Sequence, residues 1–142
     1  MSENVIQGGQ PTLHCLAIVV CNEVIEDKRT NNKTLVGLFN CILVPSVPAH
    51  HPCLWVLVSL SGGEGQYAVE LVIKLPSGHQ LAAVQGQIKL AREADVLDAA
   101  FAFPQFPLPE AGVYTVDLLV NGHPTAYRKF VVQVPPKPKG QP

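Results

Sequence analysis

The dipeptide Asn121-Gly122 constrains the fold of this chain more than any other short stretch. It separates two runs that are rich in β-branched and aromatic residues, 113–120 and 124–134. A two-residue type I′ turn needs a positive φ at both central positions, and Asn followed by Gly adopts that conformation at little cost. The stretch therefore predicts an antiparallel β-hairpin near the end of the chain.

Further β-prone runs, separated by turn signals, precede this hairpin and begin near residues 13, 34, 53, 66, 80 and 96. The clearest apolar alternation occupies 66–75, where Tyr67, Val69, Leu71 and Ile73 share one side. The turn residues at 76–79 predict that 80–90 returns antiparallel. Because the helix-prone piece at 91–95 is too short to stand alone, the chain is expected to be all-β.

Three segments between these runs are expected to leave the sheets. Residues 22–33 hold most of the charge in the first half of the chain and are expected to form a loop, with a twisted hairpin tip as the alternative. The prolines of 45–52 and 104–109 predict rigid crossings, since proline cannot donate to a central ladder. Gly37, inside the strand expected at 34–44, indicates a bulge or a close backbone approach.

With 142 residues and 15.3 kDa, the chain has the size of a single domain. The polar residues 1–12 predict a flexible arm, and the proline-rich residues 135–142 predict a disordered tail. The domain is therefore expected at 13–134. No apolar run reaches the length of a membrane span and no basic-then-apolar leader opens the chain, so a cytoplasmic protein without membrane contact is expected.

Charge is scarce in this sequence. Charged residues make up 15% and hydrophobic residues 47%, and the formal net charge is -1. Nucleic acid is an unfavourable partner, because neutralising phosphates requires clustered lysine and arginine. A surface this poor in charge instead predicts apolar contact with a protein partner, most simply in a homo-oligomer.

The histidines and cysteines are candidate metal ligands: His14, His50, His51, His79, His123, Cys15, Cys21, Cys41 and Cys53. None shows the Cys-x-x-Cys or His-x-x-x-His spacing of a structural zinc site. On one strand Cys15 and Cys21 would share a face but lie about 20 Å apart. Reduced, buried thiols are therefore expected, with no disulfide, metal or other cofactor.

Catalytic candidates are equally sparse. Cys53 next to His50 and His51 comes nearest to a nucleophile with a base, but a cysteine that opens an apolar strand ordinarily packs in the core. No Gly-x-Ser-x-Gly elbow occurs. No catalytic residue is therefore expected.

Two other features admit a functional interpretation. A set of oxygen-bearing residues could gather around Ca²⁺, namely Asn22, Glu23, Glu26, Asp27, Asn31 and Asn32. A solvated loop explains them better, because no Asp-x-Asp-x-Asp run is present. Trp55 lies in an apolar run, and a core position is favoured over an exposed interface anchor.

The predicted strands favour a two-sheet antiparallel sandwich of seven to eight strands with Greek-key connections, and a small closed barrel is the alternative. Residues Glu110 to Val116 resemble the Gly-x-Tyr-x-Cys stretch of immunoglobulin domains. Gly112 and Tyr114 match that pattern, whereas Val116 stands where the cysteine would be. The resemblance implies an immunoglobulin-like sandwich without the inter-sheet disulfide.

A broader resemblance links the chain to an uncharacterised group of small bacterial cytoplasmic proteins. It rests on Val20-Cys21-Asn22, Val36-Gly37-Leu38-Phe39, Pro48-Ala49-His50-His51-Pro52, the stretch from Phe106 to Tyr114, and Asn121-Gly122. It spans about residues 13–134. The resemblance implies a β-sandwich and brings no known activity.

We therefore expect a non-enzymatic protein interaction or assembly module that self-associates through an apolar sheet face or an edge strand. Residues 22–33 and the proline crossings would form its partner-specific surface. The alternative is a small-ligand carrier or minor enzyme with a pocket near His50, His51 and Cys53. A third hypothesis is an accessory domain that acts beside the product of a neighbouring gene.

Overall fold

The computed structural model describes residues 13–92 and 95–136, and every regular element in these ranges is a β-strand. The strands are β2 (Leu13–Glu26), β3 (Lys33–Leu38), β4 (Cys41–Leu43), β5 (Ala49–Gly62), β6 (Gly65–Lys74), β7 (Gln80–Leu90), β8 (Val96–Leu108), β9 (Gly112–Val120) and β10 (His123–Gln133). The predicted arm at 1–12 lies outside the described residues, as do residues 93–94 of the helix-prone piece and 137–142 of the tail.

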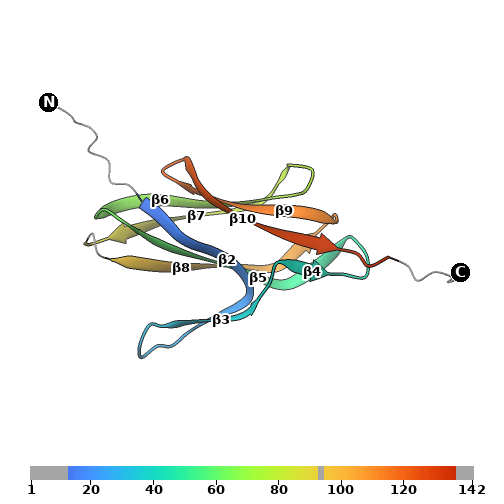
Figure 1. Cartoon of the computed structure of the whole chain (residues 1–142), viewed down its shortest axis with the longest axis horizontal. Coiled ribbons are helices and arrows are strands. Elements are labelled where there is room, and N and C mark those ends of the chain that lie inside the picture. The colour runs from blue at the N-terminus through green and yellow to red at the C-terminus, as the bar shows by residue number, and fades with distance from the viewer. Residues whose placement is uncertain (1–12, 93–94, 137–142) are drawn as a thin grey trace, which may run out of the picture.

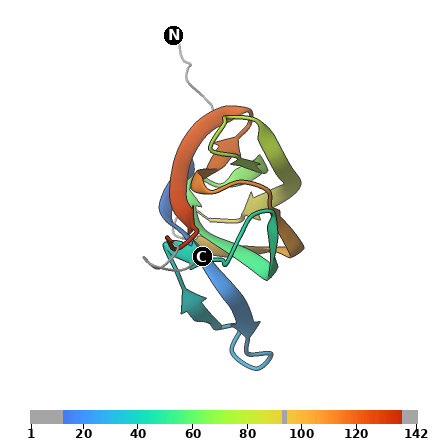
Figure 2. The same ribbon diagram turned by 90° about the vertical axis from the view of Figure 1, so that its right-hand side faces the viewer.

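The strands form two sheets that pack face to face (Figures 1 and 2). One sheet has the order β4-β10-β9-β6-β7, and the other has the order β3-β2-β5-β8. All pairs are antiparallel except β4 with β10, which is parallel. The all-β sandwich predicted from the sequence is confirmed, with this one parallel pair as a departure from the antiparallel expectation.

Two predicted turns position their strands as expected. Asn121 and Gly122 have φ values of 51° and 82°, as a type I′ turn requires, and they join β9 to β10. The turn at 76–79 joins β6 to β7, which pair antiparallel from Gly65↔Leu90 to Lys74↔Gln80. In both hairpins a local signal was sufficient to define the pairing.

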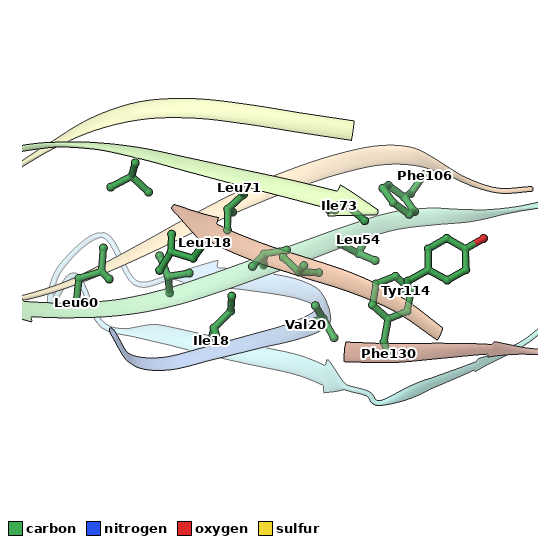
Figure 3. Packing of buried hydrophobic residues seen from close by; sticks show 14 of the residues in the cluster. Ile18, Val20, Leu54, Leu60, Leu71, Ile73, Phe106, Tyr114, Leu118 and Phe130 are labelled. Carbon is green, nitrogen blue, oxygen red and sulfur yellow. The ribbon is translucent and has the colours of Figure 1, made fainter. Parts of the chain in front are cut away.

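The core lies between the two sheets and follows from strand alternation (Figure 3). In β5 the inward residues Leu54, Val56, Val58 and Leu60 are completely buried, and they face Leu71 and Ile73 of β6 and Val116 and Leu118 of β9. Burying each such side chain contributes about 1.5–3 kcal/mol. At one end of the core the Tyr114 hydroxyl donates to the Glu110 carbonyl over 2.6 Å.

The first predicted loop is shorter than expected. Strand β2 continues to Glu26 and pairs with β3 up to Glu26↔Lys33, so the loop contains only residues 27–32. Residues 22–38 therefore form a two-stranded projection, here called the β2–β3 ribbon (Figures 1 and 2). The charges of this segment suggested a loop, but cross-strand pairs of opposite charge such as Glu26 with Lys33 are compatible with a strand.

The single strand predicted at 34–44 is in fact two strands in different sheets. Asn40 explains the change of sheet, because its carbonyl accepts from the Val131 amide over 2.9 Å and its side-chain oxygen accepts from Arg128 over 2.7 Å. These bonds to β10 draw the chain away from β2. Strand β4 then pairs with β10 alone among the described strands.

The two proline segments lead from one sheet to the other, from β4 to β5 and from β8 to β9, as predicted, but residues 49–52 and 104–108 belong to strands. Strand β5 starts at Ala49 and includes Pro52, and β8 includes Pro104 and Pro107. The prolines are tolerated because β8 is an edge strand, and because β2 pairs with β5 only from Trp55 onwards. No proline in the strands that the structure describes therefore sits between two hydrogen-bonded neighbours.

Candidate functional site

Two neighbouring rows on the outer face of the β3-β2-β5-β8 sheet are apolar: Leu38–Cys21–Trp55–Ala102 and Val19–Leu57–Ala100. The row next to them, Ala17–Ser59–Asp98, is polar. These residues point outward because their neighbours in sequence, such as Val20 and Val56, are buried in the core. The preferred prediction for Trp55, a core position, is therefore wrong: its side chain lies half-buried on this outer face, where the alternation of β5 places it.

The outer face of the other sheet has a different chemistry. Lys74 of β6 and Asp117 of β9 form an ion pair at 3.5 Å. Beside them, Gln85 of β7 donates to the Glu70 carboxylate over 3.2 Å. Polar groups are thus paired with each other on this outer face, whereas the two rows from Val19 to Ala102 on the other outer face are apolar.

The β2–β3 ribbon adds exposed apolar side chains next to the apolar face. Nine large hydrophobic residues of the described chain are exposed, and four of them are in the ribbon: Ile25 (48%), Leu35 (36%), Val36 (41%) and Leu38 (56%). A hollow of about 440 Å³ separates the ribbon from the sheet and is lined by Asn31, Asn32, Lys33, Leu35, Leu57 and Asp98. The ribbon and the outer face therefore form one surface.

At the base of the ribbon, Asn22 and Gly37 make a close contact with each other. Gly37 has a φ of 69°, and a Cβ at this position would overlap the Asn22 side-chain amide and lie 3.0 Å from its Cγ. The Asn22 amide oxygen also accepts a hydrogen bond from His51 Nε2 over 2.9 Å. The bulge or close approach predicted for Gly37 is thus confirmed, and its partner is a side chain on the neighbouring strand.

His51 connects this contact to the core. Its ring lies 5.5 Å from the ring of Phe39, which packs edge-on against Phe130 with ring centroids 6.0 Å apart. Burial lowers the pKa of His51 below its usual value, which favours the neutral imidazole. Its hydrogen bond and packing give His51 a structural role at the base of the ribbon.

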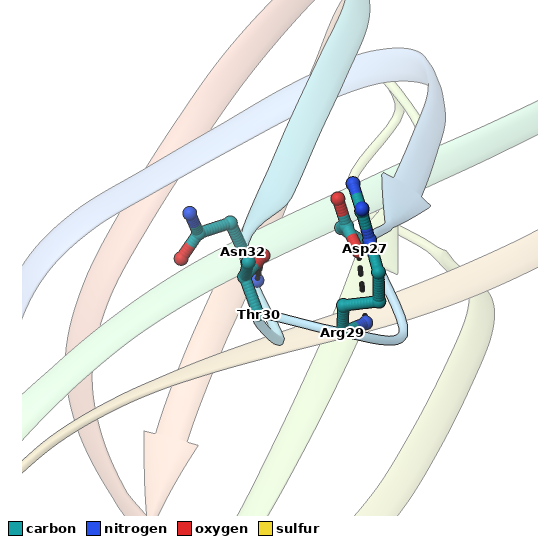
Figure 4. A network of polar contacts seen from close by, with 4 residues as sticks. All are labelled: Asp27, Arg29, Thr30 and Asn32. Atoms are coloured by element: carbon teal, nitrogen blue, oxygen red, sulfur yellow. Dashed lines mark hydrogen bonds and ion pairs between the residues drawn. The ribbon is translucent and has the colours of Figure 1, made fainter.

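Of the residues considered as Ca²⁺ ligands, Asp27 and Asn32 lie at the ribbon tip and contact neighbours outside that set (Figure 4), whereas Asn22 and Glu23 lie at the ribbon base. The Arg29 amide donates to Asp27 over 2.8 Å, and the Asn32 amide donates to the Thr30 hydroxyl over 3.2 Å. Glu26 pairs with Lys33 at 3.3 Å. Among the described residues, no three His, Cys, Asp or Glu side chains gather as a metal site would require.

The four cysteines are free thiols, but the expectation of buried thiols is correct only for Cys21, since Cys41 is exposed and Cys15 and Cys53 are intermediate. A β-bulge between Cys15 and Ala17 shifts the pairing of β2 with β5, so Cys15 packs against the inter-sheet core while Cys21 lies on the opposite side, next to Trp55. The expectation that Cys15 and Cys21 share a face is therefore wrong. Burial raises the pKa of both thiols, which makes them poor nucleophiles at neutral pH.

The structure does not assemble His50, His51 and Cys53 into a catalytic group. They pair with Pro107, Phe106 and Pro104 of β8, and His50 is exposed while His51 contacts Asn22. Three hollows of about 440 to 530 Å³ on the described surface are lined by other residues.

Sequence reasoning missed the Asn22–His51 contact, and it gave the hairpin that forms the ribbon only as the alternative to a loop. The available signal was the resemblance itself, because the short segments that carry it include Asn22, Gly37, Phe39 and His51, which meet at one place in the fold.

Within the described residues there is also no helix long and apolar enough to cross a membrane.

The fold and this surface define the class of protein: an all-β sandwich with two apolar rows on one outer sheet face. The chain belongs to a protein family of unknown function, DUF6941, whose pattern matches residues 16–133. The predicted membership of an uncharacterised family is thereby confirmed.

Two solved structures are similar to the chain. One is the alkylpurine DNA glycosylase AlkC of Pseudomonas fluorescens bound to DNA containing an abasic site analog, with a TM-score of 0.53 and 15% identity. The match covers 89% of this chain but 31% of that one, and at this identity it shows the fold alone. The other is an immunoglobulin-like protein from Pseudomonas aeruginosa, with a TM-score of 0.46, 17% identity, and coverage of 89% of this chain and 100% of that one. No curated protein matches the chain.

Proposed function

We propose that this chain is a non-enzymatic interaction module that self-associates through the outer face of the β3-β2-β5-β8 sheet together with the β2–β3 ribbon. The observation that carries the proposal is the contrast between the two outer faces. The rows from Val19 to Ala102 contain no charged side chain, whereas ion pairs and amide–carboxylate pairs occupy the other face.

The energetics support burial of this surface. Apolar area removed from water contributes about 25 cal/mol per Å², and covering the two rows from Val19 to Ala102 would desolvate no charged side chain of those rows. Stable protein interfaces bury about 1,200–2,000 Å² in total, which one sheet face with an adjoining ribbon can supply. A second copy of the chain offers the same apolar surface, as a twofold interface requires.

The alternative, a pocket near His50, His51 and Cys53, has less support. His51 is engaged with Asn22, and His50 and Cys53 pair with prolines of β8 in the strand that borders the apolar face. A carrier or enzyme needs converging polar groups in a cavity, and these residues do not converge.

Leu38→Lys should weaken self-association strongly. Leu38 is 56% exposed in the row that contains Trp55, and a lysine there would place a charge in the proposed interface. Measured by light scattering during size exclusion, the wild-type chain should form a species heavier than 15.3 kDa as its concentration rises. The variant should require at least a tenfold higher concentration, equivalent to about 1.4 kcal/mol.

The matched control is Leu43→Lys, which changes an exposed leucine in an edge strand of the other sheet. It should leave self-association unchanged. A wild-type chain that stays monomeric at all concentrations would contradict the proposal, as would equal loss of association in both variants. Circular dichroism should show that both variants keep the fold.

A further inference from the structure

We infer that the free edge of β3 pairs antiparallel with β3 of a second copy, so that the two β2–β3 ribbons form one four-stranded layer across a twofold axis. The inference rests on the proposed function and specifies which strand edge meets the second copy. Its basis is the backbone of Lys33 to Leu38, since within the described part of the chain β3 pairs with β2 alone.

Of the four edge strands, β3 is the least protected against pairing. Strand β8 contains Pro104 and Pro107, with Gln105 at a positive φ of 51° between them. Strand β4 has only three residues. Strand β7 lies beside β8, so that a Cβ on Gly86 would be 4.0 Å from the Phe101 ring. By contrast, β3 has no proline and five of its six residues are exposed.

The backbone groups available on this edge follow from the ladder. The Asp27 amide donates to the Asn32 carbonyl over 2.9 Å, in register with the β2–β3 pairs. Hydrogen-bonded and non-bonded pairs alternate in an antiparallel ladder, so Thr34 and Val36 bond to β2. Lys33 and Leu35 then direct their N–H and C=O groups to the free edge. These groups can be satisfied by an extended strand.

A second copy suits this edge better than an unrelated strand. With the twofold axis at Leu35, Leu35 lies opposite Leu35 of the second copy and Thr34 lies opposite Val36 of the second copy. The single charged residue of β3, Lys33, then falls at opposite ends of the pairing, so no like charges face each other. A parallel arrangement would bring the two lysines together.

Pairing would also remove a weakness of the ribbon. A two-stranded ribbon is marginally stable in water, whereas three or more strands with a hydrophobic face can be stable. Two ribbons paired through β3 form a four-stranded layer that carries the exposed Ile25, Leu35 and Val36 of each copy.

Hydrogen exchange of the full-length wild-type chain tests this pairing, with amides resolved individually by NMR. When the concentration is raised through the range in which light scattering detects assembly, the Lys33 and Leu35 amides should exchange at least tenfold more slowly. Amides of the β7 edge serve as the internal control and should not change. In Leu38→Lys, the exchange rates of the β3 amides should not change over the same range of concentration.

The outcomes separate this inference from the proposed function. Assembly without a change at Lys33 and Leu35 would overturn the β3 pairing and leave self-association in place. Assembly with new protection on β7 in place of β3 would also overturn it. A chain that remains monomeric would contradict the proposed function and the pairing together.

Discussion

Replacing Phe130 with alanine should cost about 3–5 kcal/mol of folding free energy, a large part of the 5–15 kcal/mol typical of a domain. Phe130 is 1% exposed, stacks on Tyr114 with ring centroids 5.1 Å apart, and meets the edge of Phe39. Alanine would leave a cavity where β10, β9 and the β3–β4 connection meet. Urea unfolding followed by circular dichroism measures the loss.

Tyr127→Ala is the matched control, since it removes another aromatic side chain from the same strand. Tyr127 is 62% exposed and contacts the Lys129 ammonium at 5.7 Å from the ring centroid. An exposed contact of this kind contributes about 0.5–1 kcal/mol, so the control should lose no more than that. Similar losses in both variants would show that Phe130 is not part of a packed core.

Gly37→Ala should destabilise the protein by about 2–3 kcal/mol. Alanine at a φ of 69° costs about 1–2 kcal/mol, because the left-handed region crowds Cβ against the backbone. The new methyl group would also displace the Asn22 side chain and break its hydrogen bond to His51, a loss of about 1 kcal/mol. Thermal and urea unfolding give the free energy of unfolding.

Comparison with Gly122→Ala isolates the contribution of the Asn22 contact. Gly122 also has a positive φ, 82°, but a Cβ there would meet no heavy atom within 4 Å. This control should therefore lose only the conformational part, about 1–2 kcal/mol. If Gly37→Ala and Gly122→Ala are equally destabilised, the Asn22 contact does not secure the base of the ribbon.

The parts of the fold that the sequence predicted depend on local signals. Asn121-Gly122 defines a turn by its own backbone preferences, and the alternation from Tyr67 to Ile73 identifies the buried face of β6. Enough strands could be recognised in this way to predict an all-β sandwich. None of these signals needs information about distant residues.

The missed features depend on contacts between distant residues. Asn22 and His51 are 29 positions apart, and neither has a local pattern that predicts their hydrogen bond. The transfer from β3 to β4 depends on Asn40 meeting β10. For Trp55, an apolar run on a central strand cannot reveal which parity faces the second sheet, and Leu54 and Val56 occupy the core positions. The candidate surface was therefore largely beyond prediction.

Fluorescence of Trp55 tests the central claim most directly, because it is the only tryptophan in the chain and lies on the proposed interface. As the concentration rises through the assembly range, quenching by iodide should weaken and the emission should shift to shorter wavelengths. Leu43→Lys should behave in the same way as the wild-type chain, and Leu38→Lys should show neither change. Assembly detected by light scattering with unchanged quenching of Trp55 would contradict the account.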